Sequence, residues 1–282
     1  MENSSVSNNV DSDMPTFKQQ ELSGWDSKAK HYDDHAGEIT RKAVQYLLTA
    51  ADVKTGTRLL DVACGPGYGA GYAANQGAIA VGVDFAPGMV AEAKKNFPNA
   101  EFHEGDAEAL AFEDNTFDVV ICAFGLLHFA EPDKAIAEAF RVLRPGGRYV
   151  FTVWSLPEKH DFFSLVLNAV DSHGTFDVPL PQAPSIFRFS EDAECINTLT
   201  TAGFTDIEVK ELPLHWNPTS PEDLLSFLEK SSVRMALVLE KQTPDALAKI
   251  HQSILDGAQR LKLGESYQLD WPAVLAIARK PL

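Results

Sequence analysis

We predict an α/β fold: a doubly wound, mostly parallel sheet with helices on both faces and a helical lid. Between residues 58 and 154, short and nearly continuous apolar runs alternate with stretches of helical periodicity. Strands that are apolar throughout are buried on both faces, which is typical of a parallel sheet covered by helices. A glycine, aspartate or proline follows each run, where a strand would turn into the next helix. At 282 residues the chain is long enough for one large domain with a lid, or at most two small domains.

The strands of this sheet can be placed from the apolar runs. The expected strands cover residues 59–63, 79–83, 100–103, 119–124 and 149–154, of which the third is the weakest. The stretch before the first strand has helical spacing, with apolar residues on one face and charges on the other. The alternation of strand and helix predicts five βα units, in which helices connect neighbouring parallel strands.

The chain beyond residue 154 has a looser pattern. Prolines interrupt the phenylalanine-rich segment 155–189, so we expect loops of fixed shape there without regular structure. Helices are expected over 221–263, and these two segments should form the lid. The remaining elements are a helix and two strands, expected at 190–202, 206–214 and 267–278. We therefore expect one domain over 21–282, preceded by a flexible polar tail at 1–20.

Charge and composition exclude several classes of partner. The 24 Lys and Arg against 40 Asp and Glu give a net charge of −16. A surface this negative repels phosphate backbones and anionic lipids, so neither nucleic acid nor a membrane is an expected partner. The first 20 residues lack the basic start and apolar core of a signal peptide. The three cysteines lie far apart, with neither metal-ligand nor disulfide spacing. We expect a soluble cytoplasmic protein without a metal site.

A glycine-rich turn follows the first strand. The chain reads Leu-Leu-Asp-Val-Ala-Cys-Gly-Pro-Gly from Leu59 to Gly67. Glycines at Gly65 and Gly67 let the backbone approach a ligand closely, and the next helix would present its positive N-terminal end. The same spacing also fits a relaxed dinucleotide-binding fingerprint, so the turn alone does not decide between ligands.

Two further acids lie at the ends of the next strands. Asp84 closes the second strand, 19 residues after Gly65, where a carboxylate can accept hydrogen bonds from ribose hydroxyls. It can equally cap the helix that follows. Asp106, between Gly105 and Ala107, follows the third strand and can accept the exocyclic amine of an adenine. A plain turn aspartate is the alternative there.

Together these residues resemble the class I (Rossmann-like) S-adenosylmethionine-dependent methyltransferases. Asp61 and the two glycines resemble the glycine-rich motif of that family, with Ala63 in place of its first glycine. Residues 117–120 and 143–147 resemble its entries into the fourth and fifth strands, and the family's sheet has seven strands. Trp25, followed after six residues by Tyr32 and Asp33, resembles the N-terminal signature of the subgroup with the ubiquinone and menaquinone biosynthesis methyltransferases.

The resemblance implies a transferase of small-molecule metabolism that uses S-adenosyl-L-methionine. The residues that it places at the cofactor are Tyr32, Asp61, Ala63, Gly65, Gly67, Asp84, Phe85, Met89, Gly105, Asp106, Ala107, Ala123 and Phe124. The substrate is expected to be a small, largely apolar or aromatic metabolite. Methylation at oxygen, nitrogen or carbon stays open, as does the oligomeric state.

His128 is the candidate catalytic base. It lies just past the fourth strand, where the methyl group should point, and an imidazole can accept a proton near neutral pH. Alternatively, His128 shapes the pocket or caps the next helix without transferring a proton. The aromatic residues of 155–189, together with Trp154 and Trp216, could form an apolar substrate wall or ordinary core.

Two other functions share part of this pattern. An NAD-dependent oxidoreductase would use the same glycine turn and ribose acid, but dinucleotide-binding folds are normally apolar at the position of Asp61. The sequence also has no Tyr-x-x-x-Lys pair for hydride transfer. A non-catalytic cofactor-binding subunit is the second alternative, and the complete set of cofactor residues argues against it.

Overall fold

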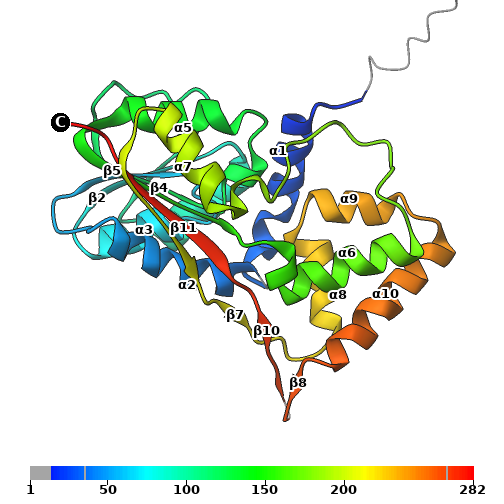
Figure 1. The fold of residues 1–282 in the computed structure, drawn as a ribbon. Helices are drawn as coiled ribbons and strands as arrows, with labels where there is room; N and C mark the ends of the chain where they lie inside the picture. Colours follow the sequence, from blue (N-terminus) through cyan, green and yellow to red (C-terminus); the bar gives the residue numbers. More distant parts are fainter. Residues whose placement is uncertain (1–13, 35, 265) are drawn as a thin grey trace, which may run out of the picture.

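The computed structural model describes residues 14–34, 36–264 and 266–282, and these form a seven-stranded sheet (Figure 1). Its strands are β1 (Arg58–Val62), β2 (Ile79–Asp84), β3 (Glu101–Glu104), β4 (Phe117–Ala123), β5 (Leu143–Trp154), β6 (Thr205–Leu212) and β11 (Ala273–Arg279). The order is β3-β2-β1-β4-β5-β11-β6, and β11 alone runs antiparallel to its two neighbours. The predicted doubly wound, mostly parallel sheet is confirmed. Because the order reverses between β1 and β4, a crevice opens at the carboxyl ends of these two strands.

Helices cover both faces of the sheet. One face carries α2 (Ala36–Ala50), α3 (Tyr68–Asn75) and α4 (Pro87–Asn96), and the other carries α5 (Pro132–Val142) and α7 (Asp192–Thr201). Neighbouring residues of β1 point to opposite faces, so Leu59 and Leu60 belong to two different buried clusters. This double burial explains why the strands are apolar at nearly every position.

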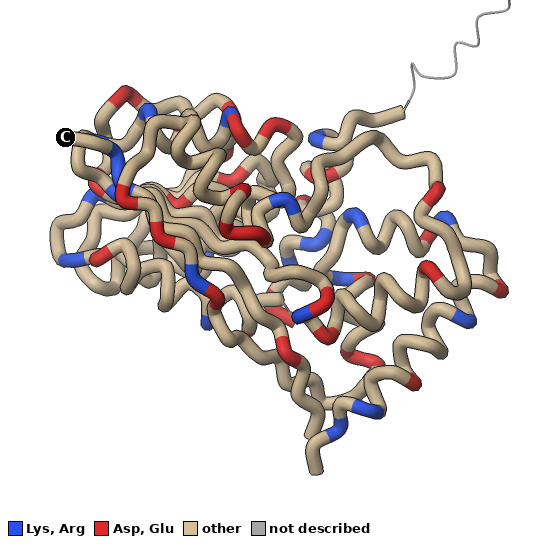
Figure 2. The backbone as a smooth tube through the Cα atoms, in the orientation of Figure 1, with Lys and Arg blue, Asp and Glu red and all other residues tan. Residues whose placement is uncertain are grey.

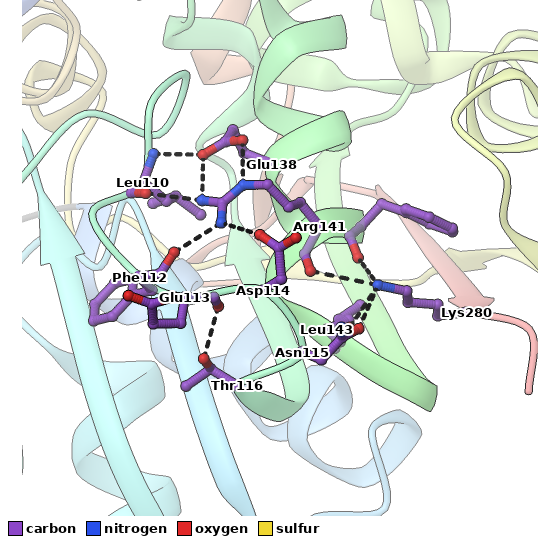
Figure 3. A network of polar contacts seen from close by, with 11 residues as sticks. Leu110, Phe112, Glu113, Asp114, Asn115, Thr116, Glu138, Arg141, Leu143 and Lys280 are labelled. Atoms are coloured by element: carbon purple, nitrogen blue, oxygen red, sulfur yellow. Dashed lines mark hydrogen bonds and ion pairs between the residues drawn. The ribbon is translucent and has the colours of Figure 1, made fainter.

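The connection from β3 to β4 corrects the prediction of five βα units, because it is a loop. Arg141 of α5 donates to the carbonyl oxygens of Leu110 and Phe112 at 2.9 and 2.7 Å (Figure 3). The same guanidinium pairs with Asp114 and, through two nitrogens, with Glu138. Arg141 thus satisfies carbonyl groups of this loop, which in a helix would have accepted from backbone amides.

A lysine near the C-terminus ties the same end of the sheet together. Lys280 Nζ donates to the carbonyl oxygens of Phe140 and Leu143, each at 2.8 Å, and to Asn115 Oδ1 at 2.9 Å (Figure 3). These bonds join the residues after β11 to the end of α5 and the start of β5. The amino ends of the central strands are therefore cross-linked by polar contacts, on the side away from the crevice.

Four helices lie beyond the carboxyl ends of the strands (Figure 1). They are α6 (Asp161–His173), α8 (Glu222–Ser231), α9 (Arg234–Glu240) and α10 (Pro244–Gln259). Helix α6 corrects the expectation of loops over 155–189, because the prolines flank it and leave an apolar stripe intact. Phe162, Val166, Ala169 and Val170 form this buried stripe, and the His160 ring caps the first turn. That these segments act as a lid stays a prediction.

The last predicted strand is divided. Residues 267–278 contain parts of β9 (Ser266–Tyr267) and β10 (Leu269–Asp270), and β11 begins only after Pro272. Proline cannot donate to a strand ladder, which explains the break. Strand β10 pairs with β7 (His215–Trp216), and β9 pairs with β8 (Lys262–Leu263), so these short pairs lie between the sheet and the helices beyond it (Figure 1).

The predicted tail also needs correction. Residues 1–13 lie outside the described residues, but helix α1 (Phe17–Lys28) begins within the segment assigned to the tail. Thr16 accepts from the Gln19 amide while the Gln19 side chain accepts from the Thr16 amide, which forms a capping box. Phe17, Glu21 and Trp25 repeat at four-residue spacing and are buried. Helix α1 continues into a 3₁₀ turn, η1 (Ala29–Asp34), and packs against α4.

Two properties of the described residues bear on the predicted environment. No helix among them is long and apolar enough to cross a membrane. Cys64, Cys122 and Cys195 are buried free thiols.

Candidate active site

A cavity of about 270 Å³ opens at the carboxyl ends of β1, β2 and β4. One end is formed by the turns that follow these strands. The other end is formed by α6, α8 and the start of α9, with Trp271 before β11, and α1 closes the side. A much smaller pocket adjoins it along the residues that follow β3. The two share Ala63, Asp84, Phe85, His128 and Phe129 as lining residues.

The glycine turn opens onto this cavity at one position. Gly65 has a φ of +52°, and a Cβ placed there would have no atom within 4 Å, so its open side is free for a ligand. Gly67 has a φ of +91° and a different role. A Cβ there would lie 2.9 Å from the side chains of both Ala93 and Phe102, so this glycine lets the start of α3 pack closely against α4 and β3.

Asp61 lies behind the turn and outside the lining of both pockets. It is 1% exposed, and its Oδ2 accepts the backbone amide of Ala70 at 2.8 Å. Burial raises the pKa of Asp61 to about 7. This acid therefore shapes the turn and the first turn of α3. Of the predicted cofactor residues, Asp61 and Gly67 support the site from behind.

Asp84 lines both pockets at the end of β2. Its Oδ2 accepts the Gly65 amide at 2.8 Å and its Oδ1 accepts the Ala86 amide at 2.9 Å. Burial raises the pKa of Asp84 to about 6, against the opposite effect of these backbone bonds. Each carboxylate oxygen keeps a second lone pair for a ligand hydroxyl. Asp84 thus holds the start of α4 and faces the cavity, and its role as a ribose acceptor stays a prediction.

The smaller pocket contains the predicted adenine-side residues. Gly105, Asp106 and Ala107 line it, next to a lysine that sequence reasoning had assigned to the tail. Lys18 Nζ lies 2.5 Å from Asp106 Oδ2 and 2.8 Å from Glu108 Oε2. In this structure the Asp106 carboxylate is paired with α1.

The other predicted cofactor residues all line the main cavity. They are Tyr32, Ala63, Phe85, Met89, Ala123 and Phe124. The Tyr32 hydroxyl bonds Thr40 Oγ1 at 2.8 Å, and burial raises the pKa of Tyr32 to about 12. Ala63 and Phe124 both have positive φ, near +55°, at the ends of β1 and β4. Such conformations are uncommon outside glycine and cluster at ligand sites.

His128 lies where the two pockets meet, in the short 3₁₀ turn η2 (Leu126–His128) after β4. Its Nδ1 is 2.8 Å from Glu21 Oε2 of α1, and its ring makes an edge contact with Trp25 at 4.9 Å between centroids. The imidazole is about one quarter exposed, while Glu21 is only 2% exposed. The ring is thus partly accessible, and the two residues of α1 that hold it line the main cavity with it.

Sequence reasoning missed several lining residues. Those from α1 are Phe17, Lys18 and Glu21, and those at the far end of the cavity include Phe227, Ser232, Val233 and Trp271. The α1 residues could have been found from the Thr16-x-x-Gln19 capping box. Trp271 carries no local signal, because it reaches the cavity only through the packing of β11 against β5.

His215 and Trp216 are placed apart from the main cavity. His215 Nδ1 pairs with Asp270 at 2.9 Å on the short strands, and Trp216 is buried against Phe227 and Trp271. Among the described residues no three acids, histidines and cysteines gather as a metal ion would require.

The donor set of the cavity suits S-adenosylmethionine. The open side of Gly65 forms a backbone cradle, and the Asp84 carboxylate stands at its rim with free lone pairs. Phe85 and Met89 supply apolar surface for a nucleoside. Aromatic rings and carboxylates both attract a positively charged sulfur. Residues that lie between 32 and 124 in the sequence thus combine in one site of the right chemistry.

Comparisons with known proteins show the family of this chain. Residues 60–151 match the family model described as a methyltransferase domain. A demethylmenaquinone methyltransferase of Paenarthrobacter aurescens is 34% identical over 182 residues, which cover 61% of this chain and 72% of that protein. One of Renibacterium salmoninarum is 42% identical over 118 residues, or 42% of this chain and half of that protein.

A solved structure shows the same fold. Phosphoethanolamine N-methyltransferase 2 of Haemonchus contortus, in complex with phosphomonomethylethanolamine and S-adenosylhomocysteine, aligns with a TM-score of 0.58 at 22% identity. The alignment covers 95% of this chain and 61% of that one. The NAD-dependent alternative is not favoured by these relatives. With the cofactor cradle, the sheet order and these similarities taken together, the chain belongs to the class I S-adenosylmethionine-dependent methyltransferases that act on small molecules.

Proposed function

We propose that this methyltransferase acts on a largely apolar, aromatic acceptor of the phenol or quinol class, and that His128 takes up the proton which the acceptor loses. The observation that carries the proposal is that His128 lines one cavity together with Gly65, Asp84 and a set of aromatic side chains. The names of the relatives, demethylmenaquinone methyltransferases, support an acceptor of this chemistry.

The acceptor end of the cavity is aromatic on several sides. Trp154 stacks on Phe124 with 3.8 Å between ring centroids, and Phe162 stacks on Trp271 with 4.7 Å. Phe163 contacts Trp154 from α6. Rings at these distances leave flat apolar faces, against which another planar ring can stack. Among the described residues that line the main cavity, Arg234 is the one lysine or arginine, so an anionic acceptor would find little positive charge to pair with.

The residues of this chain bind, orient and shield the reactants. Asp84 accepts hydroxyl hydrogen bonds of the ribose, and Asp106 accepts the adenine amine once Lys18 releases it. Bound S-adenosylmethionine supplies an electrophilic methyl group on a positively charged sulfur. The aromatic wall aligns the acceptor and keeps water away, which supplies much of the rate enhancement by positioning alone.

The acceptor proton goes to His128. With S-adenosylmethionine bound, bonding of the acceptor's nucleophilic atom to the methyl carbon would break the carbon–sulfur bond and leave its electron pair on sulfur. The hydroxyl proton of the acceptor passes to Nε2 of His128, the ring nitrogen that does not face Glu21. S-adenosylhomocysteine, the methylated product and a proton on the imidazole balance the step. A base of this kind contributes about 10²–10⁴-fold.

An activity screen with labelled cofactor tests the proposal. Phenols and quinols with an apolar tail should be methylated faster than amines or carboxylates of similar size. His128→Ala should lower kcat about 10²-fold while S-adenosylhomocysteine binds nearly as before, because the imidazole acts on the acceptor proton. The matched control is His215→Ala, which should retain full activity. His215 is half-exposed and lies outside the main cavity. If kcat of His128→Ala falls only a few-fold, the histidine lines the cavity but is not the base.

We also propose that the enzyme works in the cytoplasm without nucleic acid as a partner. Figure 2 places acidic and basic residues among one another over both the sheet and the helices beyond it. The net charge of −16 supports repulsion of phosphate backbones. Three buried free thiols suit a reducing compartment. Retention on a DNA or RNA column at low salt would contradict this part of the proposal.

A further inference from the structure

A buried carboxylate lies next to the candidate base. Glu21 is 2% exposed, whereas the other acidic and basic residues of α1 are partly or fully exposed. Its Oε2 accepts the Trp25 Nε1 proton at 3.1 Å and lies 2.8 Å from His128 Nδ1. A carboxylate so deeply buried is strongly disfavoured unless it is hydrogen-bonded to a proton donor. Here the imidazole and the indole supply these donors.

This contact sets the state of the imidazole. Because a carboxylate accepts and does not donate, Nδ1 of His128 must carry the proton. Nε2 then keeps its lone pair and is the ring atom left to accept a proton. The edge of the Trp25 ring, inclined at 79° to the imidazole, holds the ring plane from a second direction. A carboxylate, an imidazole and a proton to be removed form the arrangement by which many hydrolases orient a base.

We propose that Glu21 is a positioning residue for His128: it fixes the tautomer in which Nε2 is the base, and it stabilises the imidazolium that forms when the acceptor loses its proton. The inference rests on the proposed base role of His128. It assigns to α1 a part in the reaction as well as in closing the cavity. The two side chains lie 107 residues apart in the sequence, so the dyad exists only when α1 is seated.

Other charged and titratable groups surround the dyad and must be held constant in any test. They are Lys18 on α1, Tyr32 on η1, Asp84 at the end of β2, Asp106 and Glu108 after β3, and Arg234 on α9. Asp84 lies close enough for the His128 charge to lower its pKa, against the larger effect of burial. A comparison of variants that differ only at Glu21 leaves all these groups in place.

The decisive variant is Glu21→Gln. The amide oxygen of glutamine can accept from both Trp25 and His128, so the geometry is kept and only the charge is removed. Without the negative charge the imidazolium is less stable, and the acidic limb of the pH–kcat profile should move about one unit or more to lower pH. The kcat on the plateau should fall about tenfold or more, with the acceptor KM nearly unchanged. Glu38→Gln on α2, which removes an exposed carboxylate paired with Lys42, is the matched control and should change neither.

A second measurement does not depend on turnover. Nitrogen-15 NMR of the histidine-labelled protein reports which ring nitrogen carries the proton. We expect His128 in the wild type to be protonated at Nδ1 when neutral, and Glu21→Ala to give a mixture of both tautomers. A mixture in the wild type as well would overturn the inference.

The outcomes separate this inference from the proposal beneath it. If His128→Ala loses about 10²-fold and Glu21→Gln changes neither the acidic limb nor kcat, Glu21 is a structural residue and the base survives. If the losses in kcat of Glu21→Gln and His128→Ala add up in the double variant, the two residues do not act as a unit and the inference is also wrong. If His128→Ala loses only a few-fold, the base role itself is wrong, and the dyad falls with it. Non-additive losses with a shifted acidic limb are the expected result.

Discussion

The two ends of the cavity are built in different ways. The cofactor end consists of turns that directly follow β1 and β2, and its parts are held by bonds from backbone amides to a side-chain carboxylate, such as that from the Gly65 amide to Asp84. The acceptor end consists of side chains from α6, α8, α9 and the residues before β11. A turn is a local structure, whereas the aromatic wall exists only after distant segments have packed. Changes at the first end should therefore affect cofactor affinity, and changes at the second should affect acceptor recognition.

The two ends should also differ in the amino-acid substitutions that they tolerate. At the cofactor end, a glycine with positive φ and a buried acid tolerate few replacements, because the backbone path depends on them. At the acceptor end, each aromatic residue contributes surface and shape, so one ring can be replaced while the others still enclose the space. We therefore expect the cofactor end to tolerate few substitutions and the acceptor end to set the substrate specificity.

Asp84→Ala should have the largest effect on cofactor affinity. The variant loses the ribose contacts and also releases the Gly65 and Ala86 amides, so binding of S-adenosylhomocysteine should weaken by roughly 2–4 kcal/mol. Calorimetry measures this directly. Asp106→Ala should weaken binding less, by about 1–2 kcal/mol, since one amine contact is lost. A folded Asp84→Ala protein with unchanged affinity would break the division between the two ends.

The acid beneath the turn should affect stability in a pH-dependent way. The pKa of Asp61 is about 7 in the folded protein and near 4 in an unfolded chain, so the folded state binds the extra proton between these values. Its contribution to stability is thus greatest at low pH and is lost as the pH rises through 7. Asp61→Asn keeps an acceptor for the Ala70 amide but carries no charge. The Tm advantage of Asp61→Asn over the wild type should grow by about 5 °C from pH 5 to pH 8.

Thermal unfolding of the ligand-free proteins at several pH values checks this prediction. Asp84, whose pKa is also raised, titrates in both proteins and largely cancels in the comparison. A Tm difference that is constant with pH would mean that Asp61 is ionised throughout in the folded state.

Phe163→Ala tests the acceptor end. Phe163 lines the cavity from α6 and contacts Trp154 and Phe187, but it is only partly buried, so the fold should survive its truncation. The acceptor KM should rise about tenfold because one wall of the ring site is lost, equivalent to about 1.4 kcal/mol. The affinity for S-adenosylhomocysteine should stay the same. Steady-state kinetics and calorimetry on one preparation separate the two, and a joint loss would show that the ends are coupled.

The same contrast explains how far the sequence could be interpreted. The first four strands were predicted to within two residues because buried parallel strands are apolar throughout, whereas β5 begins six residues earlier and β11 six residues later than predicted. The acids Asp84 and Asp106 could be placed because each lies at or just after the end of a strand. The β3–β4 connection was predicted wrongly, since nothing local indicates that the side chain of Arg141 replaces helical hydrogen bonds. Sequence patterns indicate structures that depend on neighbouring residues. The β3–β4 loop was not predicted because it depends on Arg141, which comes from α5.

The site shows the same limit. His128 was found from its position after β4, but its partner Glu21 was not, because that residue lies close to a segment taken as a tail. Polar composition concealed a helix with a buried stripe of one phenylalanine, one glutamate and one tryptophan at four-residue spacing. A carboxylate in such a stripe is a signal that hydrophobic periodicity alone does not register. Trp271 likewise depends on the antiparallel pairing of β11.

Lys18→Ala should have the smallest effect, and its sign is informative. Lys18 pairs with Asp106 and Glu108 across the smaller pocket, and both Lys18 and Asp106 are more than one third exposed, so solvent weakens the pair. If Asp106 binds the adenine amine, the lysine competes with the cofactor, and its removal should tighten S-adenosylhomocysteine binding by at most about fivefold. This corresponds to no more than about 1 kcal/mol, in the range of exposed ion pairs.

The opposite sign would carry a different meaning. Helix α1 also seats Phe17 and Glu21, so a lysine that mainly holds this helix in place would, when removed, loosen the closure of the cavity. Binding would then weaken, and kcat would fall together with the Glu21–His128 contact. Calorimetry at two salt concentrations distinguishes the cases: a competing ion pair is screened by salt, so the wild type should approach the Lys18→Ala affinity as the ionic strength rises. If instead the wild type stays the tighter binder at every salt concentration, Lys18 belongs to the architecture of the cofactor end, and that end depends on a distant segment after all.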